Sequence, residues 1–192
     1  MSSVAISGNA SGAGVLTIAA PNTASNYTLT LPTNTGTLIS TASTGQVIPK
    51  AALPTGSVLQ VVQANYSTEV SSSSASYVTT NLVGTITPTS STSRVLVITS
   101  MQISRAAGTS SNSGMNLQLQ RNATAIQTSQ SLLYTNSNLA LRAIYAYSYL
   151  DSPATTSATT YTWYMAQQNA GDVIYTNTNN TTSTIILMEI AA

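Results

Sequence analysis

The sequence predicts an all-β protein in which an N-terminal segment of short strands precedes an antiparallel β-sandwich. Short runs of alternating apolar and polar residues recur along the 192 residues, and clusters of Ser, Thr, Asn, Gly and Pro separate these runs. No helical period continues for more than two turns. Alternation with period two is typical of strands that lay one face on a core, so these observations favour strands throughout.

The composition is that of an ordered and nearly uncharged protein. Hydrophobic residues make up 42% of the chain and charged residues 5%, whereas soluble domains usually carry about 25% charged residues. Ser and Thr supply roughly a third of the sequence, and Thr favours strands. The net charge is +1, and the scattered basic residues argue against nucleic acid, because phosphate contacts need clustered cations. These basic residues are Lys50, Arg94, Arg105, Arg121 and Arg142. No apolar stretch reaches the ~18 residues of a membrane helix, so membrane insertion is not expected.

The stretch from 14 to 40 contains three short strand-like runs, at 15–19, 27–31 and 37–39, punctuated by Pro, Asn and Gly. Runs this short cannot bury a core within one chain, because an isolated hairpin is marginal in water. We therefore expect another copy of the chain to supply the missing face. The candidate interface residues are the apolar members of these runs, Val15, Ile18, Tyr27, Leu29, Leu31 and Leu38.

A connector follows, because two prolines and two glycines fall within the dozen residues 45–56. We place the domain boundary there, with an assembly and anchoring arm at 1–56 and a sandwich domain at 57–192. The predicted strands of the second domain are 57–66, 77–88, 94–104, 115–121, 123–129, 139–150, 159–168, 172–176 and 184–190. Strands evenly spaced by turn residues indicate a sandwich or barrel, and this number of strands suits a jelly roll.

One predicted strand is apolar on both of its faces. Alternation places Tyr145, Tyr147 and Tyr149 on one face and Ile144 and Leu150 on the other. A strand at the surface of a single sandwich would turn one face to water. The pattern therefore predicts that a neighbouring subunit provides the second cover.

The run GVLTIAAPNTASNYTLTLPTNTGTLIS at 14–40 resembles a strand-rich segment of bacteriophage fibre and other virion structural proteins, often from cyanophages or marine phages. Residues 56–62 and 183–190 look like the opening and closing strands of the domain that often follows that segment. The resemblance implies a homotrimer without catalysis. Together with the number of strands, it leads us to expect a trimeric jelly roll like the tumour-necrosis-factor fold. It also implies partners among other virion proteins, such as the major capsid protein or the tail baseplate. The N-terminus lacks the basic start and apolar run of a signal peptide, so we expect synthesis in the host cytoplasm and exposure on the virion surface.

Candidate residues for catalysis are few. The chain has no His and no Cys, which excludes Ser-His-Asp triads, Cys-His dyads and the common zinc sites. The carboxylates are Glu69, Asp151, Asp172 and Glu189, and their positions favour turns and solvated strand ends over a glycosidase pair. We expect no enzymatic activity, no metal and no cofactor.

The aromatic residues are the remaining site-like feature, since the chain has no Phe. Tyr145, Tyr147 and Tyr149 share one strand face, and Tyr161 and Trp163 share a face of another strand. These rings could stack on sugars of a host surface. Packing in the core or in a subunit interface is the interpretation that we favour.

Two functions follow from these expectations. The first is a compact, homotrimeric protein that decorates or cements a capsid. The alternative is a short tail-fibre or fibre-tip protein that binds a host surface glycan. A depolymerase, as a third class, would need a carboxylate pair that the chain does not offer.

Overall fold

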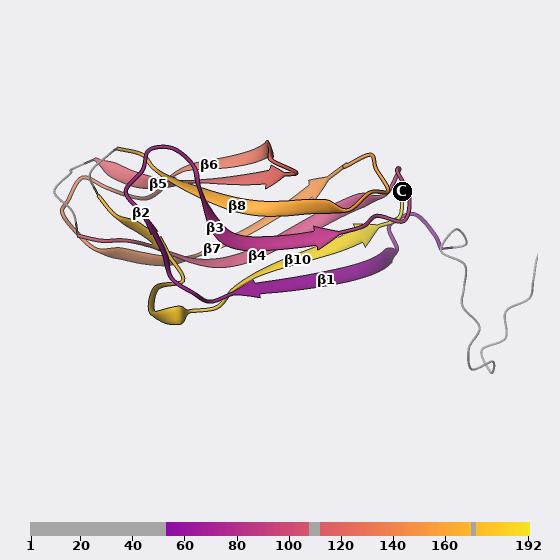
Figure 1. Ribbon diagram of the computed structural model, residues 1–192, viewed down its shortest axis with the longest axis horizontal. Coiled ribbons are helices and arrows are strands. Elements are labelled where there is room, and N and C mark those ends of the chain that lie inside the picture. The colour runs from indigo at the N-terminus through magenta and orange to yellow at the C-terminus, as the bar shows by residue number, and fades with distance from the viewer. Residues whose placement is uncertain (1–52, 108–111, 170–171) are drawn as a thin grey trace, which may run out of the picture. The chain divides into compact units, whose positions relative to one another are not determined.

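The computed structural model describes residues 53–107, 112–169 and 172–192 (Figure 1). The chain divides into two units, Met1–Gln46 and Val47–Ala192, and the described residues all belong to the second unit. The N-terminal interface residues predicted above lie outside the described residues, and the domain boundary predicted at residue 56 stays a prediction.

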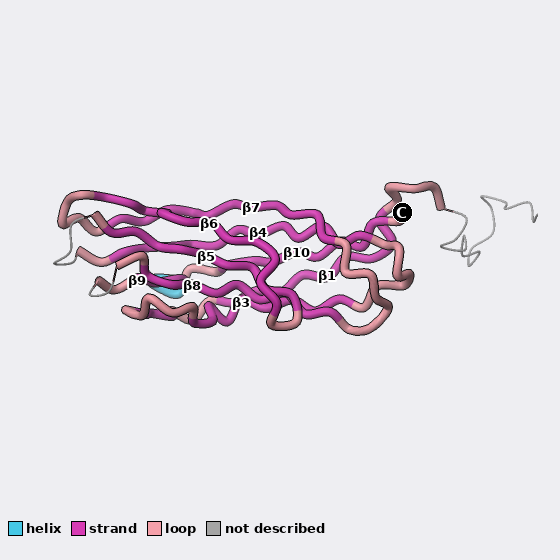
Figure 2. Tube along the Cα trace, turned by 90° about the horizontal axis from the view of Figure 1, so that it is seen from above, coloured by secondary structure: helices cyan, strands magenta, loops and turns pink. Residues whose placement is uncertain are grey.

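Within the described ranges the chain forms two antiparallel sheets, as an all-β sandwich requires (Figures 1 and 2). The six-stranded sheet contains β1 (Val58–Tyr66), β2 (Val70–Ser72), β4 (Arg94–Arg105), β7 (Leu141–Asp151), β9 (Ile174–Thr176) and β10 (Ser183–Ile190). The four-stranded sheet contains β3 (Val78–Ile86), β5 (Ser113–Arg121), β6 (Thr124–Thr135) and β8 (Thr159–Gln167). The helical part is a 3-10 turn, η2 (Thr178–Asn180). No helix in the described ranges is long and apolar enough to cross a membrane.

Strand β4 is the centre of the six-stranded sheet. Along one side it pairs with β10 and then with β9, and along its other side it pairs with β7 over nearly its whole length. Figure 2 shows β7, β4, β10 and β1 in this order across the sheet. The four-stranded sheet has the order β3-β8-β5-β6. All strand pairs in the described ranges are antiparallel.

The hydrophobic core lies between the two sheets because their inward-facing residues alternate with outward-facing ones. In β8 and β10 every second residue is buried, as period-two side chains predict. Trp163 is fully buried at the centre, and its Nε1 donates to Thr99 Oγ1 of the opposite sheet at 2.8 Å. Fully buried side chains such as Leu82, Leu117 and Leu187 belong to the same core cluster as Trp163.

Most predicted strands lie within a few residues of the observed ones, but two predictions were wrong. We predicted a strand at 123–129, whereas β6 continues to Thr135. Its alternation is broken because Ser131 and Leu133 adopt positive φ and the β5–β6 register shifts there. No strand was predicted between residues 66 and 77, whereas β2 occupies Val70–Ser72 through pairing with β9.

Candidate interaction surface

The outward face of the six-stranded sheet carries an apolar row that crosses four strands. The register places Val61 opposite Met188, Met188 opposite Leu96, and Leu96 opposite Leu150. Val61 is 55% exposed and Leu150 is 45% exposed. The row therefore presents hydrophobic side chains to solvent from β1 at one edge to β7 at the other.

The next row continues this surface at its centre, where Gln63 and Ser148 flank the pair Ile186–Ile98, and Ile144 lies two rows farther along β7, beyond the pair Ser100–Ala146. Ile186 pairs with Ile98, which is 37% exposed, and Ile144 farther along β7 is 60% exposed. We call this surface the apolar band. It consists of Val61, Leu96, Ile98, Ile144, Leu150, Ile186 and Met188.

The outward face of the four-stranded sheet is more polar, although Val83 is 39% exposed there. Thr85 and Thr160 pair in register and their hydroxyls hydrogen-bond at 2.9 Å. Thr162 lies opposite Gln120, and the Gln120 side chain donates to Gln118 at 2.7 Å. This face shows how the chain builds a sheet surface for water, with Thr and Gln in place of charge. The apolar band is built differently, as expected of a surface that another molecule covers.

Strand β7 also has an unpaired edge in the described part of the chain. Its 11 residues pair with β4 alone. Natural sheets protect such edges with charges, prolines or short strands. In β7 the charged residues are Arg142 at its start and Asp151 at its end, and Asp151 is buried. The edge and the apolar band meet at β7, so both features point to the same partner surface.

The predicted aromatic residues lie between the sheets rather than in separate groups. Tyr145 stacks on Tyr147 with ring centroids 5.7 Å apart. Trp163 meets both rings edge-on, at 5.4 and 5.9 Å. Tyr161 and Trp163 are fully buried, Tyr145 is 9% exposed, and Tyr147 and Tyr149 are half-buried. Binding of a glycan by these rings stays a prediction.

The buried tyrosines have polar partners that change their titration. Burial raises the pKa of Tyr145, although its hydrogen bond to Ser129 at 2.7 Å opposes this. Burial also raises the pKa of Tyr161, and donation of its hydroxyl proton to Asp151 at 2.7 Å raises it further. Both hydroxyls therefore stay protonated at neutral pH, and that of Tyr161 acts as a structural donor.

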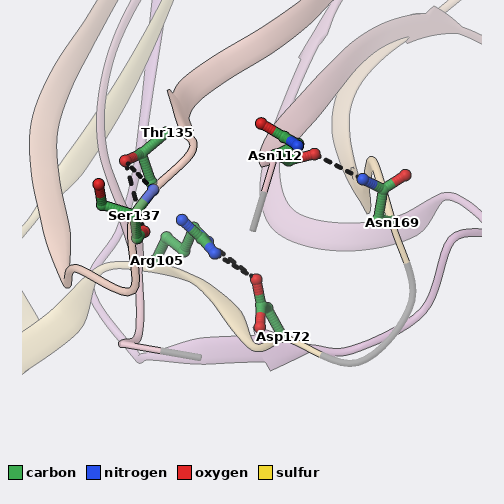
Figure 3. Close-up of polar contacts among 6 residues, drawn as sticks. All are labelled: Arg105, Asn112, Thr135, Ser137, Asn169 and Asp172. Carbon is green, nitrogen blue, oxygen red and sulfur yellow. Dashed lines mark hydrogen bonds and ion pairs between the residues drawn. The ribbon is translucent and has the colours of Figure 1, made fainter. Parts of the chain in front are cut away.

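Three of the four carboxylates have structural partners, which corrects the prediction that they are solvated. Arg121 Nη1 lies 2.9 Å from both oxygens of Asp151. Arg105 binds Asp172 in a buried ion pair (Figure 3). Glu189 accepts hydrogen bonds from Gln60 and from the Thr89 amide. The partners come from distant parts of the sequence, so local turn patterns could not predict the burial. No cluster of three or more metal-ligating side chains occurs within the described ranges.

Sequence reasoning found Ile144 and Leu150 as an outward apolar face but missed the rest of the apolar band. The signal was present in two other strands. Residues 95–98 and 185–188 are continuously apolar, and such runs indicate strands that are covered on both faces.

Comparisons with known proteins describe this fold without assigning it to a family. Neither a family model nor a curated protein sequence matches the chain. Dimeric latent PorU from Porphyromonas gingivalis matches 68% of this chain at a TM-score of 0.38 and 12% identity. A structure of the Gt strain of infectious bursal disease virus matches 78% of this chain at a TM-score of 0.39 and 10% identity. A structure of the VP2 subviral particle of that virus matches 78% of this chain at a TM-score of 0.38 and 11% identity.

The chain spans 13% of the PorU chain and 42% of each of these two viral chains. Similarity of this size carries no argument about function. The resemblance of the N-terminal segment to bacteriophage proteins is therefore a basis for proposing a virion role. The physical support for that role comes from the apolar band.

Proposed function

We propose that this protein is a non-enzymatic virion structural protein of a bacteriophage, a homotrimer that decorates and cements the capsid surface. The observation that carries the proposal is the apolar band, which leaves the outward face of one sheet without a cover among the described residues. If sister copies cover the band, each Å2 of apolar surface that they bury stabilises the assembly by about 25 cal/mol. Repetition over many symmetric copies would make a weak single contact into a stable shell.

The trimer is inherited from the resemblance of residues 14–40, and the fold supports a jelly roll as its building block. Pairs β1–β10, β3–β8, β4–β7 and β5–β6 are nested. The first half of the chain therefore runs back along the second half as one long folded hairpin, wound into two sheets. This nesting is what an eight-stranded jelly roll of two Greek keys requires.

The absence of enzymatic activity belongs to the same proposal. Asp151, Asp172 and Glu189 each hold the sandwich together through the contacts above. That leaves Glu69 as the one carboxylate without an assigned structural contact, and a general acid–base pair needs two.

The decisive experiment replaces outward apolar residues without touching the core. We expect the triple variant Ile98→Thr, Ile144→Thr, Leu150→Thr to convert a trimer into a monomer with an unchanged β-sheet spectrum, because Thr suits exposed strands. The matched control is Thr85→Val with Thr162→Val on the polar sheet face, which should leave the trimer intact. Light scattering after gel filtration measures the mass, and a wild-type monomer at micromolar concentration would refute the proposal.

The alternative function is a short tail-fibre or fibre-tip protein that binds a host glycan. The feature that favours it is a hollow of about 470 Å3 whose lining includes Thr89, Ser90, Thr92 and Ser93, since hydroxyls can hydrogen-bond sugars. Labelling the chain on virions distinguishes the two functions. A cement protein would appear over the capsid and its loss would reduce heat resistance, whereas loss of a fibre protein would abolish adsorption.

A further inference from the structure

The chain has few charges, and most of those in the described residues have a partner. The sequence has four acidic residues. Asp151, Asp172 and Glu189 are engaged inside the sandwich. Glu69 is exposed, and no ion pair or hydrogen bond of its side chain is found within the described residues.

The arginines divide in the same way. Arg105 and Arg121 belong to the internal ion pairs. Arg94 and Arg142 are exposed and have no carboxylate partner in the described part of the chain. Glu69 therefore has two candidate arginine partners, and position in the sheet separates them.

Glu69 and Arg142 lie on opposite edges of the six-stranded sheet, two residues apart along the strand direction. Val70, which follows Glu69, pairs with Thr176, Thr176 pairs with Ile103, and Ile103 pairs with Ala143, which follows Arg142. The two edges are three strand spacings apart, which is roughly 14 Å in total. The two charges thus lie on two different sides of one subunit, near the same end of the sheet.

Arg94 is at the other end of the same sheet. It begins β4 and pairs with Ile190. Ten residues of extended chain separate it from Ser104, which lies opposite Arg142, and this corresponds to about 33 Å. A partner that brings Glu69 to Arg142 leaves Arg94 out of reach.

The surface around Arg142 has room for an incoming side chain. Arg142 and Thr178 line two hollows of about 250 and 280 Å3. Gln102 and Ile144 line the first hollow, and Ile144 belongs to the apolar band. A carboxylate that entered beside Arg142 would therefore lie next to Ile144 of the apolar band.

We propose that Glu69 of one copy forms an ion pair with Arg142 of the next copy, so that opposite edges of the six-stranded sheet join head to tail. A contact between two different patches of the same subunit closes into a ring under rotational symmetry. The pair fixes which edges meet, while the apolar band supplies the buried area. This inference rests on the self-association proposed above.

Charge reversal in the full-length protein tests the pair. We expect Glu69→Arg and Arg142→Glu each to raise the dissociation constant of the assembly at least about tenfold, because each places like charges in contact. The double variant Glu69→Arg, Arg142→Glu should return it to within about threefold of wild type. Sedimentation equilibrium measures the constant, and circular dichroism confirms that each variant is folded.

The matched control is the double variant Glu69→Arg, Arg94→Glu, which has the same net charge as the rescuing variant. It should assemble as poorly as Glu69→Arg alone. Equal rescue by Arg94→Glu and Arg142→Glu, or no rescue by either, would overturn the pair while leaving self-association in place. A wild-type chain that stays monomeric would instead overturn the proposed function itself. If a reversal variant fails to fold, Glu69→Gln and Arg142→Gln test the pair, because each should weaken assembly and their effects should not add.

Discussion

Glu189 illustrates how this chain uses a charge inside a nearly uncharged molecule. Its side chain is fully buried in β10. Gln60 Nε2 donates to it at 2.6 Å, and the amide and hydroxyl of Thr89 each donate at 2.7 Å. Burial raises the pKa of the Glu189 carboxyl, but these donors outweigh burial, so its pKa lies below the usual 4.5. The ionised carboxylate thereby ties β10 to β1 and to the chain after β3.

The lowered pKa predicts a pH dependence of stability. A carboxylate whose folded pKa is depressed stabilises the protein above its unfolded pKa of about 4.5 and loses this contribution as pH falls through the folded pKa. We expect the unfolding free energy of wild type to decrease below about pH 4.5, and that of Glu189→Gln to decrease less. Urea unfolding at fixed protein concentration measures both slopes, and parallel curves would contradict the prediction.

At the scale of the element, β3 approaches the opposite sheet closely at Gly84. A Cβ atom at this position would lie 3.1 Å from Leu187 Cδ1 and 3.2 Å from Ile185 Cγ2. Both neighbours are fully buried core residues of β10. The glycine therefore allows the backbone of β3 to pack directly on these side chains, and a larger residue would separate the sheets.

We expect Gly84→Val to destabilise the protein by about 1–3 kcal/mol, the usual cost of overpacking. The control is Thr85→Val at the adjacent exposed position of the same strand, which should change stability by less than about 0.5 kcal/mol. Denaturant unfolding compares the two. Equal effects would show that β3 can shift without strain.

At the scale of the whole molecule, the two sheets pack against each other through the core, but their outward faces differ in polarity. The outward face of the four-stranded sheet consists mainly of Thr and Gln. The six-stranded sheet carries the apolar band and the unpaired edge of β7. Within the described residues the core is thus covered, while one outward surface is not. Stability of the folded chain should then depend on association.

This dependence predicts a melting temperature that rises with protein concentration. For a trimer that dissociates on unfolding, each tenfold increase adds about 1 kcal/mol per subunit. That free energy corresponds to about 2–4 °C for a chain of this size. Scanning calorimetry over a hundredfold range of concentration measures the shift, and a constant melting temperature would contradict it.

Sequence alone determined the secondary structure and the class of fold, because period-two alternation and turn residues are local signals. The strands at 94–104, 159–168 and 184–190 coincide closely with β4, β8 and β10. Alternation also identified the two faces of β7. It failed at β6, where positive φ at Ser131 and Leu133 interrupts the period.

Only the tertiary structure decided which strands are neighbours, and with them every feature of the candidate surface. The apolar band exists because β1, β10, β4 and β7 lie side by side in one register. The burial of Asp172 beside Arg105 likewise depends on residues that are far apart in the sequence. Alternation assigns a residue to a face but carries no information about its cross-strand partner, since pairing is fixed by long-range packing of the whole sheet.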